Sequence, residues 1–226
     1  MSLSGANDAN DSNAGRTEKA SGKNTVGLKQ WFLLFAVAAT SVFADLWSKH
    51  LAFENVAGFT VVVNREAVQA ITSAGGKSLQ SLIPAHEPVA VIPSILNFTL
   101  VLNPGAVFGI GAGQRWFFIV FTGLAIGFAS YMFLAWTTRR DTWAHVALGL
   151  LIGGGVGNLY DRWFYACVRD FIAPLPGVKF PFGLDLFRSG GAVWPYISNV
   201  ADALLLIGIG ILAIYLWRRS SPAAAK

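Results

Sequence analysis

Residues 197–217 read ISNVADALLLIGIGILAIYLW, a run of 21 residues in which Asp202 is the one charged side chain. A helix of this length, with a rise of about 1.5 Å per residue, crosses a hydrocarbon core of roughly 30 Å. A charged group inside such a helix costs roughly 2.5–3.5 kcal/mol on insertion scales, and so it marks a functional position by default. The run therefore predicts a transmembrane helix that carries a functional carboxylate near one end.

Three further apolar runs precede this one, at 31–47, 116–136 and 143–160, and tryptophan marks at least one end of each. Amphipathic aromatic rings of this kind gather at the headgroup level of a bilayer. The chain has 226 residues, of which 54% are hydrophobic and 13% charged, and its mean hydropathy is +0.52. That composition leaves too little polar surface for a soluble globule. We predict a mainly α membrane protein with four transmembrane helices.

The segments between and beyond these runs have different compositions. Residues 48–115 contain GFTVVVN and PVAVIPSILNFTLVLN, whose β-branched residues favour a small extracytoplasmic β-sheet. Residues 171–196 are rich in proline and glycine and predict a long outer loop. Residues 1–29 are too poor in large apolar side chains to fold, so we expect a disordered cytoplasmic tail before one membrane domain at 30–218. Residues 219–226 are expected to form a second cytoplasmic tail.

Basic pairs predict the orientation of the chain. Arg139 and Arg140 lie in a tight connection, and Arg218 and Arg219 follow the last run. The positive-inside rule places both pairs, and with them both termini, in the cytoplasm. A signal peptide cleaved before Asp45 is the rival interpretation of the first run. Three further spans and the motif that begins at Asp45 favour a membrane anchor.

Polar residues gather at one depth of the predicted bundle. Counted along their helices at about 1.5 Å per residue, these positions lie roughly 21–27 Å from the inner face; they are Asp45, Asn158, Asp161 and Asp202. Asp45 and Lys49 have i,i+4 spacing and can pair on one helix face, although snorkelling into headgroups is an equal alternative for these two. The glycines of 153–157 permit the close helix packing that brings the carboxylates together.

The chemistry that these residues support is narrow. His50, His86 and His145 are dispersed and Cys167 is the single cysteine, so the usual metal-ligand patterns are absent from the sequence. Two neighbouring aspartates can act without metal, because close carboxylates share a proton and can serve as acid and base. Peptide hydrolysis is the natural candidate, with a small proton-coupled carrier or an inactive scaffold that binds lipoproteins as alternatives.

Five motifs together resemble the bacterial lipoprotein signal peptidases, also called signal peptidase II: DLWSK (45–49), NPGAVFG (103–109), GGGVGNLYDR (153–162), VRDFI (168–172) and NVADA (199–203). The resemblance implies a membrane-embedded aspartic endopeptidase of the bacterial cytoplasmic (inner) membrane. Such an enzyme removes the signal peptide of a prolipoprotein by cleaving before a cysteine that carries diacylglycerol, near the outer leaflet. It implies no cofactor and no metal.

The resemblance also implies roles for single residues. Asp170 and Asp202 are the expected catalytic pair. The residues expected to bind substrate or support the pair are Asn103, Gly105, Asn158, Arg162 and Asn199. Asp45, Lys49, Gly154 and Asp161 are expected to support the structure, with Asp161 as a partner near Arg162. The chain departs from the family pattern at Arg169, where an apolar residue is common, and in the long stretch between the two catalytic positions.

The expected partners are diacylglyceryl-prolipoproteins and membrane lipids. Nucleic acid is not expected, because the basic residues are scattered or flank apolar runs. The chain is expected to act as a monomer. Residues 55–103 and 171–196 are expected to form a cradle and a mobile lid around the scissile bond, and the alternative for the loop is a solvated insertion without function.

Overall fold

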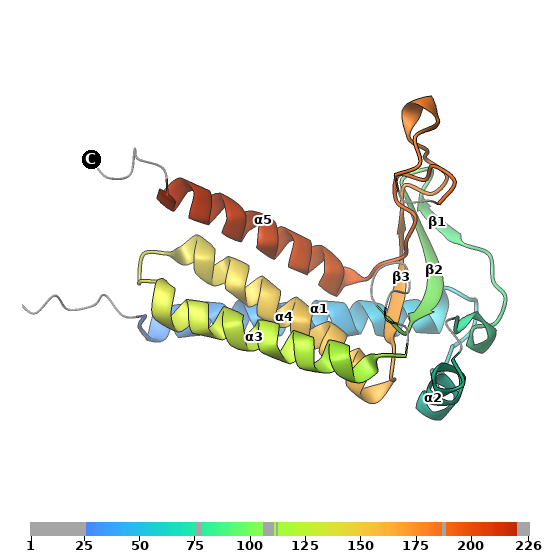
Figure 1. Cartoon of the computed structure of the whole chain (residues 1–226), viewed down its shortest axis with the longest axis horizontal. Helices are drawn as coiled ribbons and strands as arrows, with labels where there is room; N and C mark the ends of the chain where they lie inside the picture. Colours follow the sequence, from blue (N-terminus) through green and yellow to red (C-terminus); the bar gives the residue numbers. More distant parts are fainter. Residues whose placement is uncertain (1–25, 76–77, 106–110, 112, 187–188, 221–226) are drawn as a thin grey trace, which may run out of the picture.

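The computed structural model describes residues 26–75, 78–105, 111, 113–186 and 189–220. Most of the two predicted tails lies outside the described residues, as do residues 106–109 of the NPGAVFG motif. The described chain consists of a bundle of long helices with a small sheet at one end, as Figure 1 shows. Both ends of the described chain lie at the opposite end of the bundle from the sheet (Figure 1).

Four long helices form the bundle: α1 (Leu28–Asn55), α3 (Arg115–Trp136), α4 (Thr142–Phe164) and α5 (Val200–Ser220). They correspond to the four predicted runs. α1 is longer than predicted, because it continues past Trp47 to Asn55, and α5 begins at Val200 rather than at residue 197. α4 contacts each of the other three helices and is therefore the centre of the bundle (Figure 1).

Three of the described helices, α1, α3 and α5, are long and apolar enough to cross a membrane by length and composition. α4 is not among them, although it has 23 residues. Its composition differs because it carries several glycines together with His145, Asn158, Asp161 and Arg162. An interior helix of this kind faces neighbouring helices on most sides, so it does not need an apolar surface all round.

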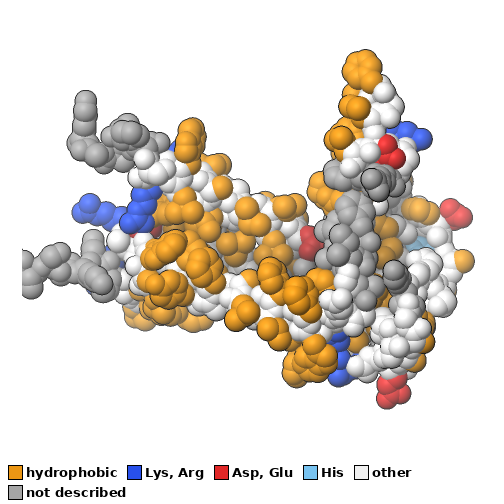
Figure 2. Space-filling view, viewed as in Figure 1, with side chains coloured by type: hydrophobic (Ala, Val, Ile, Leu, Met, Phe, Trp, Pro, Cys, Tyr) orange, Lys and Arg blue, Asp and Glu red, His pale blue; other side chains and the backbone are white. Residues whose placement is uncertain are grey.

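The outer surface of the bundle is apolar. Large side chains on α3 and α5 are more than half exposed, among them Phe117, Leu124, Leu206 and Ile209. Figure 2 shows hydrophobic side chains over the visible face of the helices, with basic side chains at the end where the chain termini lie. Exposed apolar surface on this scale marks contact with lipid or with another protein.

Glycines let α4 approach its neighbours closely. A Cβ atom at Gly154 would lie 2.8 Å from the carbonyl oxygen of Ala201 on α5, and one at Gly157 would lie 3.0 Å from Cγ of Asp45 on α1. A side chain at either position would force the helices apart. The close packing predicted for the glycines of 153–157 is therefore present, and it determines how near the polar residues of α1, α4 and α5 come to one another.

The sheet has three antiparallel strands in the order β1 (Val89–Ile92), β2 (Leu96–Asn103) and β3 (Val168–Pro174). The first two strands come from the segment that predicted them. The third is a correction, because residues 171–174 were assigned to the outer loop. β3 pairs with β2 from Asn103↔Val168 to Leu96↔Pro174, across a shift in register between Phe98 and Val101. The first four residues of β3 are all buried, so they lack the alternation of apolar and polar residues that marks a half-buried strand.

The prediction of a strand in GFTVVVN was wrong. Residues 58–64 form a turn and an irregular stretch that leads into a helix, α2 (Arg65–Ser73). Asn64 is the N-cap of α2, since its side chain accepts a hydrogen bond from the backbone N–H of Ala67 at 3.0 Å, and Glu66 stands in the first turn. Both features favour a helix start. The β-branched residues before them find no partner strand among the described residues.

A hydrophobic core joins the sheet to the bundle. Leu100 of β2 and Phe171 of β3 pack with Phe53 at the end of α1 and with Val68 of α2. Cys167, the residue before β3, belongs to the same core. The part of α1 beyond the predicted span contributes Phe53 to this core. The core therefore fixes the position of β3 against the end of α1.

Candidate active site

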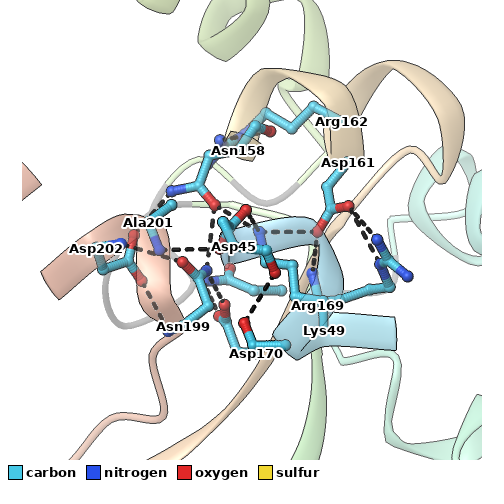
Figure 3. A network of polar contacts seen from close by, with 12 residues as sticks. Asp45, Lys49, Asn158, Asp161, Arg162, Arg169, Asp170, Asn199, Ala201 and Asp202 are labelled. Carbon is cyan, nitrogen blue, oxygen red and sulfur yellow. Dashed lines mark hydrogen bonds and ion pairs between the residues drawn. The ribbon is translucent and has the colours of Figure 1, made fainter. Parts of the chain in front are cut away.

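Asp170 lies on β3 and points into the junction between sheet and bundle (Figure 3). Its side chain is buried, with a residue exposure of 1%. Its Oδ2 accepts a hydrogen bond from Asn103 Nδ2 at 3.1 Å, and its Oδ1 accepts one from Asn199 Nδ2 at 2.6 Å. Asn103 ends β2, so the pairing of the two strands brings its amide to the carboxylate.

Asp202 stands in the first turn of α5 and is only partly buried. The backbone N–H of Asp202 donates to Asn199 Oδ1 at 3.1 Å, and the backbone N–H of Asn199 donates to Asp202 Oδ2 at 3.3 Å. This reciprocal pair is a capping box, which satisfies N–H groups at a helix start. The motif NVADA therefore begins α5 and fixes the Asp202 carboxylate at the same time.

Two amide side chains connect the aspartates. Asn199 donates to Asp170, while Asn158 of α4 donates through Nδ2 to Asp202 Oδ1 at 2.8 Å. Asn158 Oδ1 in turn accepts hydrogen bonds from Asn199 Nδ2 and from Lys49 Nζ, both at 3.1 Å. Each amide thus has its orientation determined by partners on both sides. The expected meeting of the polar residues at one level is present.

A buried ion cluster lies behind the amides. Lys49 Nζ lies 2.7 Å from Asp45 Oδ2 and 3.1 Å from Asp161 Oδ2, and the side chains of all three residues are 0% exposed. Asp45 Oδ1 also accepts the backbone N–H of Ala201 at 2.8 Å, so it caps α5 from across the bundle. The i,i+4 pair expected from DLWSK is confirmed, and the snorkelling alternative for it is wrong because both side chains are buried.

Asp161 was expected near Arg162, and the structure corrects this. Asp161 Oδ1 accepts hydrogen bonds from Arg169 Nε at 3.1 Å and Nη2 at 2.8 Å, and Oδ2 accepts the backbone N–H of Arg169 at 3.0 Å. The Arg169 guanidinium also lies 4.2 Å from the ring centroid of Tyr165. Arg169, noted as a departure from the family pattern, therefore neutralises Asp161 and anchors the start of β3.

Arg162 faces the other way. Its Nη2 donates to the carbonyl oxygen of Gly105 at 3.2 Å, and its Nη1 donates to that of Asn158 at 3.4 Å. Its guanidinium lies 5.1 Å from the ring centroid of Phe118 on α3. Gly105 is held in turn because its N–H donates to Asn103 Oδ1 at 3.0 Å. Arg162 thus joins α4 to the turn after β2.

A cavity of about 970 Å³ opens beside the two aspartates. Its polar lining includes Asn103, Asn158, Arg162, Asp170, Asn199 and Asp202. Its apolar walls include Phe117, Phe118 and Phe121 of α3, Leu205 and Leu206 of α5, and the aromatic residues Trp194 and Tyr196. Figure 2 shows a notch between the helices and the sheet end, with an acidic side chain at its corner.

The aromatic wall is the part of the site that the sequence analysis missed. Phe117, Phe118 and Phe121 are spaced along α3 so that they face the cavity and the lipid surface. Aromatic residues within an apolar run look like ordinary lipid-facing side chains. Their place in the cavity wall depends on how α3 packs beside the other elements, which the run itself does not indicate. Groups of three or more histidine, cysteine, aspartate or glutamate side chains that could hold a metal ion are absent from the part of the chain that the structure describes.

The environment of Asp170 favours its neutral form. Burial raises the pKa of this carboxyl to about 7, and the negative charge of Asp202 acts in the same direction, while hydrogen bonds from Asn199 and Asn103 oppose both effects. Two carboxylates in one poorly hydrated site cannot both ionise easily, so they tend to share one proton. Burial also raises the pKa of the Cys167 thiol, which keeps that side chain protonated.

Comparisons with known proteins found similar lipoprotein signal peptidases. The lipoprotein signal peptidase of Desulfitobacterium hafniense is 36% identical over 137 residues, which cover 60% of this chain and 78% of that protein. The lipoprotein signal peptidase of Streptococcus pyogenes serotype M5 is 40% identical over 138 residues, covering 61% of this chain and 80% of the relative.

Among solved structures, one described as a bacterial membrane enzyme matches with a TM-score of 0.56 and 26% identity, over 83% of this chain and 89% of that one. The sequence profile of the family described as signal peptidase (SPase) II matches residues 36–218. That match spans α1 to α5 with all of the site residues described above, and this multi-pass bacterial membrane protein belongs to the signal peptidase II family of proteases.

Proposed function

We propose that the chain is a membrane-embedded aspartic endopeptidase that removes signal peptides from prolipoproteins by cleaving before a diacylglyceryl-modified cysteine. The observation that carries the proposal is the pair Asp170 and Asp202, which Asn199 holds together at the edge of one cavity. Membership of the signal peptidase II family supports this substrate class and disfavours a proton-coupled carrier.

The charges around the pair support a shared proton. In the buried cluster, Asp45 and Asp161 are balanced by Lys49 and Arg169. Among the described basic residues, Arg162 alone lines the cavity that Asp170 and Asp202 share. One proton on the pair leaves one negative charge opposite one positive charge. A neutral total is the favourable state in a region of low dielectric.

The reaction follows from this protonation state. Asp170, which is buried and has a raised pKa, holds the proton. Asp202, which is more accessible, takes a proton from a water molecule as that water attacks the scissile carbonyl. Asp170 gives its proton to the carbonyl oxygen, which produces a tetrahedral diol. Asp202 then passes its proton to the leaving nitrogen as the carbon–nitrogen bond breaks, and Asp170 takes a proton back from a hydroxyl group of the diol. One water is consumed, one carboxyl and one amine are released, and the pair regains a single proton.

The cavity walls suggest how a lipidated peptide is held. Apolar residues of α3 and α5 line one side, and these helices carry large exposed side chains toward the lipid. An acyl chain can therefore remain in contact with apolar surface while the peptide reaches the aspartates. Side-chain amides at Asn103 and Asn158 lie beside the pair and can orient the peptide backbone.

Purified protein with a diacylglyceryl-modified precursor tests the function. We expect one product cut before the lipidated cysteine, identified by mass spectrometry, and little cleavage of the same precursor without diacylglycerol. Binding of the lipidated precursor without any product would instead identify an inactive scaffold. Equal cleavage of both precursors would contradict recognition of the lipid.

We extend the proposal to the placement of the chain in the membrane. α4 is proposed to be a fourth span, since its 23 residues measure about 34 Å and its sides are covered by the other helices. Residues 30–218 are proposed to form one domain that acts as a monomer, because one chain supplies every group of the site. The site is proposed to lie toward the outer leaflet of the cytoplasmic membrane.

Thiol labelling in intact cells tests this topology. Arg139, Arg140 and Arg218 lie near the end of the bundle opposite the sheet, which predicts cytoplasmic termini. A cysteine at Arg140 should be protected from an impermeant reagent, whereas one at the exposed Glu66 of α2 should react. The reverse pattern would invert the proposed orientation.

The pH dependence of cleavage follows from the raised pKa of Asp170. Because this pKa lies at about 7, the singly protonated pair is lost as pH rises through neutrality, and cleavage should fall about tenfold for each further pH unit.

The stability of the protein should depend on pH in the same direction. A carboxyl whose pKa is raised by folding stabilises the folded state at low pH, so the free energy of unfolding should decrease as pH rises toward about 7 and then level off. The Asp170→Asn variant should lack this decrease, and a flat activity profile through neutrality would contradict the shared proton.

A further inference from the structure

The segment between β3 and α5 projects as a hairpin, whose described residues, 175–186 and 189–193, are here called the arm. The N–H of Phe180 donates to the carbonyl oxygen of Gly191 at 2.8 Å, and that of Val193 donates to Val178 at 2.9 Å. The side chain of Asp185 accepts the N–H groups of Ser189 and Gly190 at 2.8 and 3.1 Å. The arm is therefore a structured element with its own backbone hydrogen bonds.

The tip of the arm is apolar and uncovered. Phe182 is 98% exposed, Leu186 65%, Leu184 50% and Val178 37%. Phe182 has a φ of +61°, a left-handed conformation that is unfavourable for a bulky residue and that here projects the ring outward. Large apolar side chains presented together in this way are costly in water and indicate a binding surface.

The arm does not cover the cavity in this structure. The cavity is lined by Pro174 and by residues 194–198, which flank the arm in sequence and are here called its base. No described residue from 175 to 193 lines the cavity. Figure 1 shows the arm, in orange, leaving the sheet end of the bundle and extending past the end of α5, across the helix axes rather than along them. Of the loop expected to act as a lid, the ends therefore lie beside the cavity and the described residues of the arm do not.

This direction determines which environment meets the tip. In the proposed topology the helices cross the membrane along their axes, so an element that extends across those axes at their sheet-side end runs along the membrane surface. At that end, Trp116, Trp163 and Phe164 are about half exposed or more, as in the aromatic belts of membrane proteins. On α5, which begins at Val200 at the same end, the large exposed apolar side chains start at Leu206.

We propose that the arm is a membrane-interface anchor, whose tip residues Phe182, Leu184 and Leu186 insert among the headgroups and upper acyl chains of the sheet-side leaflet. The occupant of this surface is the bilayer itself, because the arm extends across the helix axes at the end of the bundle where the exposed aromatic residues gather. Between residues 175 and 193 the sequence carries Lys179, Asp185 and Arg188, a net charge of +1, so apolar contact rather than charge is the main attraction to the bilayer. By fixing the tip in the interface, the arm holds its base, Trp194 and Tyr196, against the cavity.

A nitroxide spin label at Phe182→Cys tests the insertion in the full chain, with one copy per lipid nanodisc. The native Cys167 stays in place, because it is buried and its raised pKa keeps the thiol unreactive. Two labelled references define the scale: Ile209→Cys on the lipid-facing side of α5, and Glu66→Cys on the polar helix α2. Collision with oxygen reports contact with lipid, and collision with a soluble nickel chelate reports contact with water.

We expect the label at 182 to resemble that at 209, with frequent oxygen collisions and few nickel collisions. Adding Leu184→Ser and Leu186→Ser should raise nickel collisions at 182 toward the value at 66, while an unchanged unfolding temperature shows that the variant is folded. Nickel collisions at 182 equal to those at 66 in the parent protein would overturn the proposal. Protection that appears only when several copies share a vesicle, with dipolar broadening between labels, would assign the tip to a second copy and overturn it equally.

Discussion

Asp170→Asn and Asp202→Asn should each lower the turnover of a diacylglyceryl precursor by roughly 10³–10⁴-fold, the size expected for loss of a positioned acid or base. Asparagine has nearly the same shape as aspartate but cannot release or accept the proton. Neither variant can form the singly protonated pair. Turnover close to that of the parent protein in either variant would remove that residue from the catalytic pair.

Controls separate this loss from misfolding. Asp170 accepts hydrogen bonds from Asn103 and Asn199, and an asparagine oxygen can keep one of them. Because burial disfavours the charged form of Asp170, the Asp170→Asn variant should unfold above neutral pH at a temperature no lower than the parent protein. Glu87→Gln removes one carboxylate from the exposed surface and should leave turnover unchanged.

Lys49→Met should be the most destabilising of the single substitutions considered. It leaves Asp45 without its ion-pair partner and removes one of the two cations beside Asp161, in a region where all three side chains are 0% exposed. Breaking a buried ion pair on one side costs about 3–5 kcal/mol, because an uncompensated charge remains. We expect a large fall in the unfolding temperature in detergent and a low yield of folded protein.

Two variants on the same helix make this prediction specific. Adding Asp45→Asn to Lys49→Met removes the stranded charge, and Asp161 keeps Arg169, so part of the stability should return. Glu54→Gln breaks the exposed His50–Glu54 pair and should change the free energy of unfolding by less than about 1 kcal/mol. An effect of Lys49→Met as small as that of Glu54→Gln would show that the cluster is not a buried ionic network.

The elements with strong local signals could be predicted from the sequence. The four helices follow from the length of the apolar runs, and β1 and β2 follow from β-branched residues between turn residues. α2 was missed although Asn64 and Glu66 are ordinary signals of a helix start, because the apolar alternation before them favoured a strand. That error was avoidable, since the relevant signals are local.

The long-range pairings could not be predicted in the same way. β3 is held by β2, some 65 residues away along the chain at Asn103↔Val168, and its first four residues are all buried, so no apolar–polar alternation marks it as a strand. Asp161 and Arg162 are neighbours in sequence, yet adjacent residues of a helix point in different directions. Asp161 therefore pairs with Arg169 and Lys49, while Arg162 turns toward Gly105.

Composition and motifs were enough to indicate a membrane protein, its aspartates and the resemblance to signal peptidase II, because the lengths of apolar runs and the residue types of motifs are written along the chain. The partners of each charge, the amide links through Asn158 and Asn199, and the direction of the arm depend on the approach of distant segments. That approach is governed by the glycines of α4 and by the core beneath the sheet. A linear pattern specifies which groups are present, whereas packing specifies which of them lie within hydrogen-bonding distance.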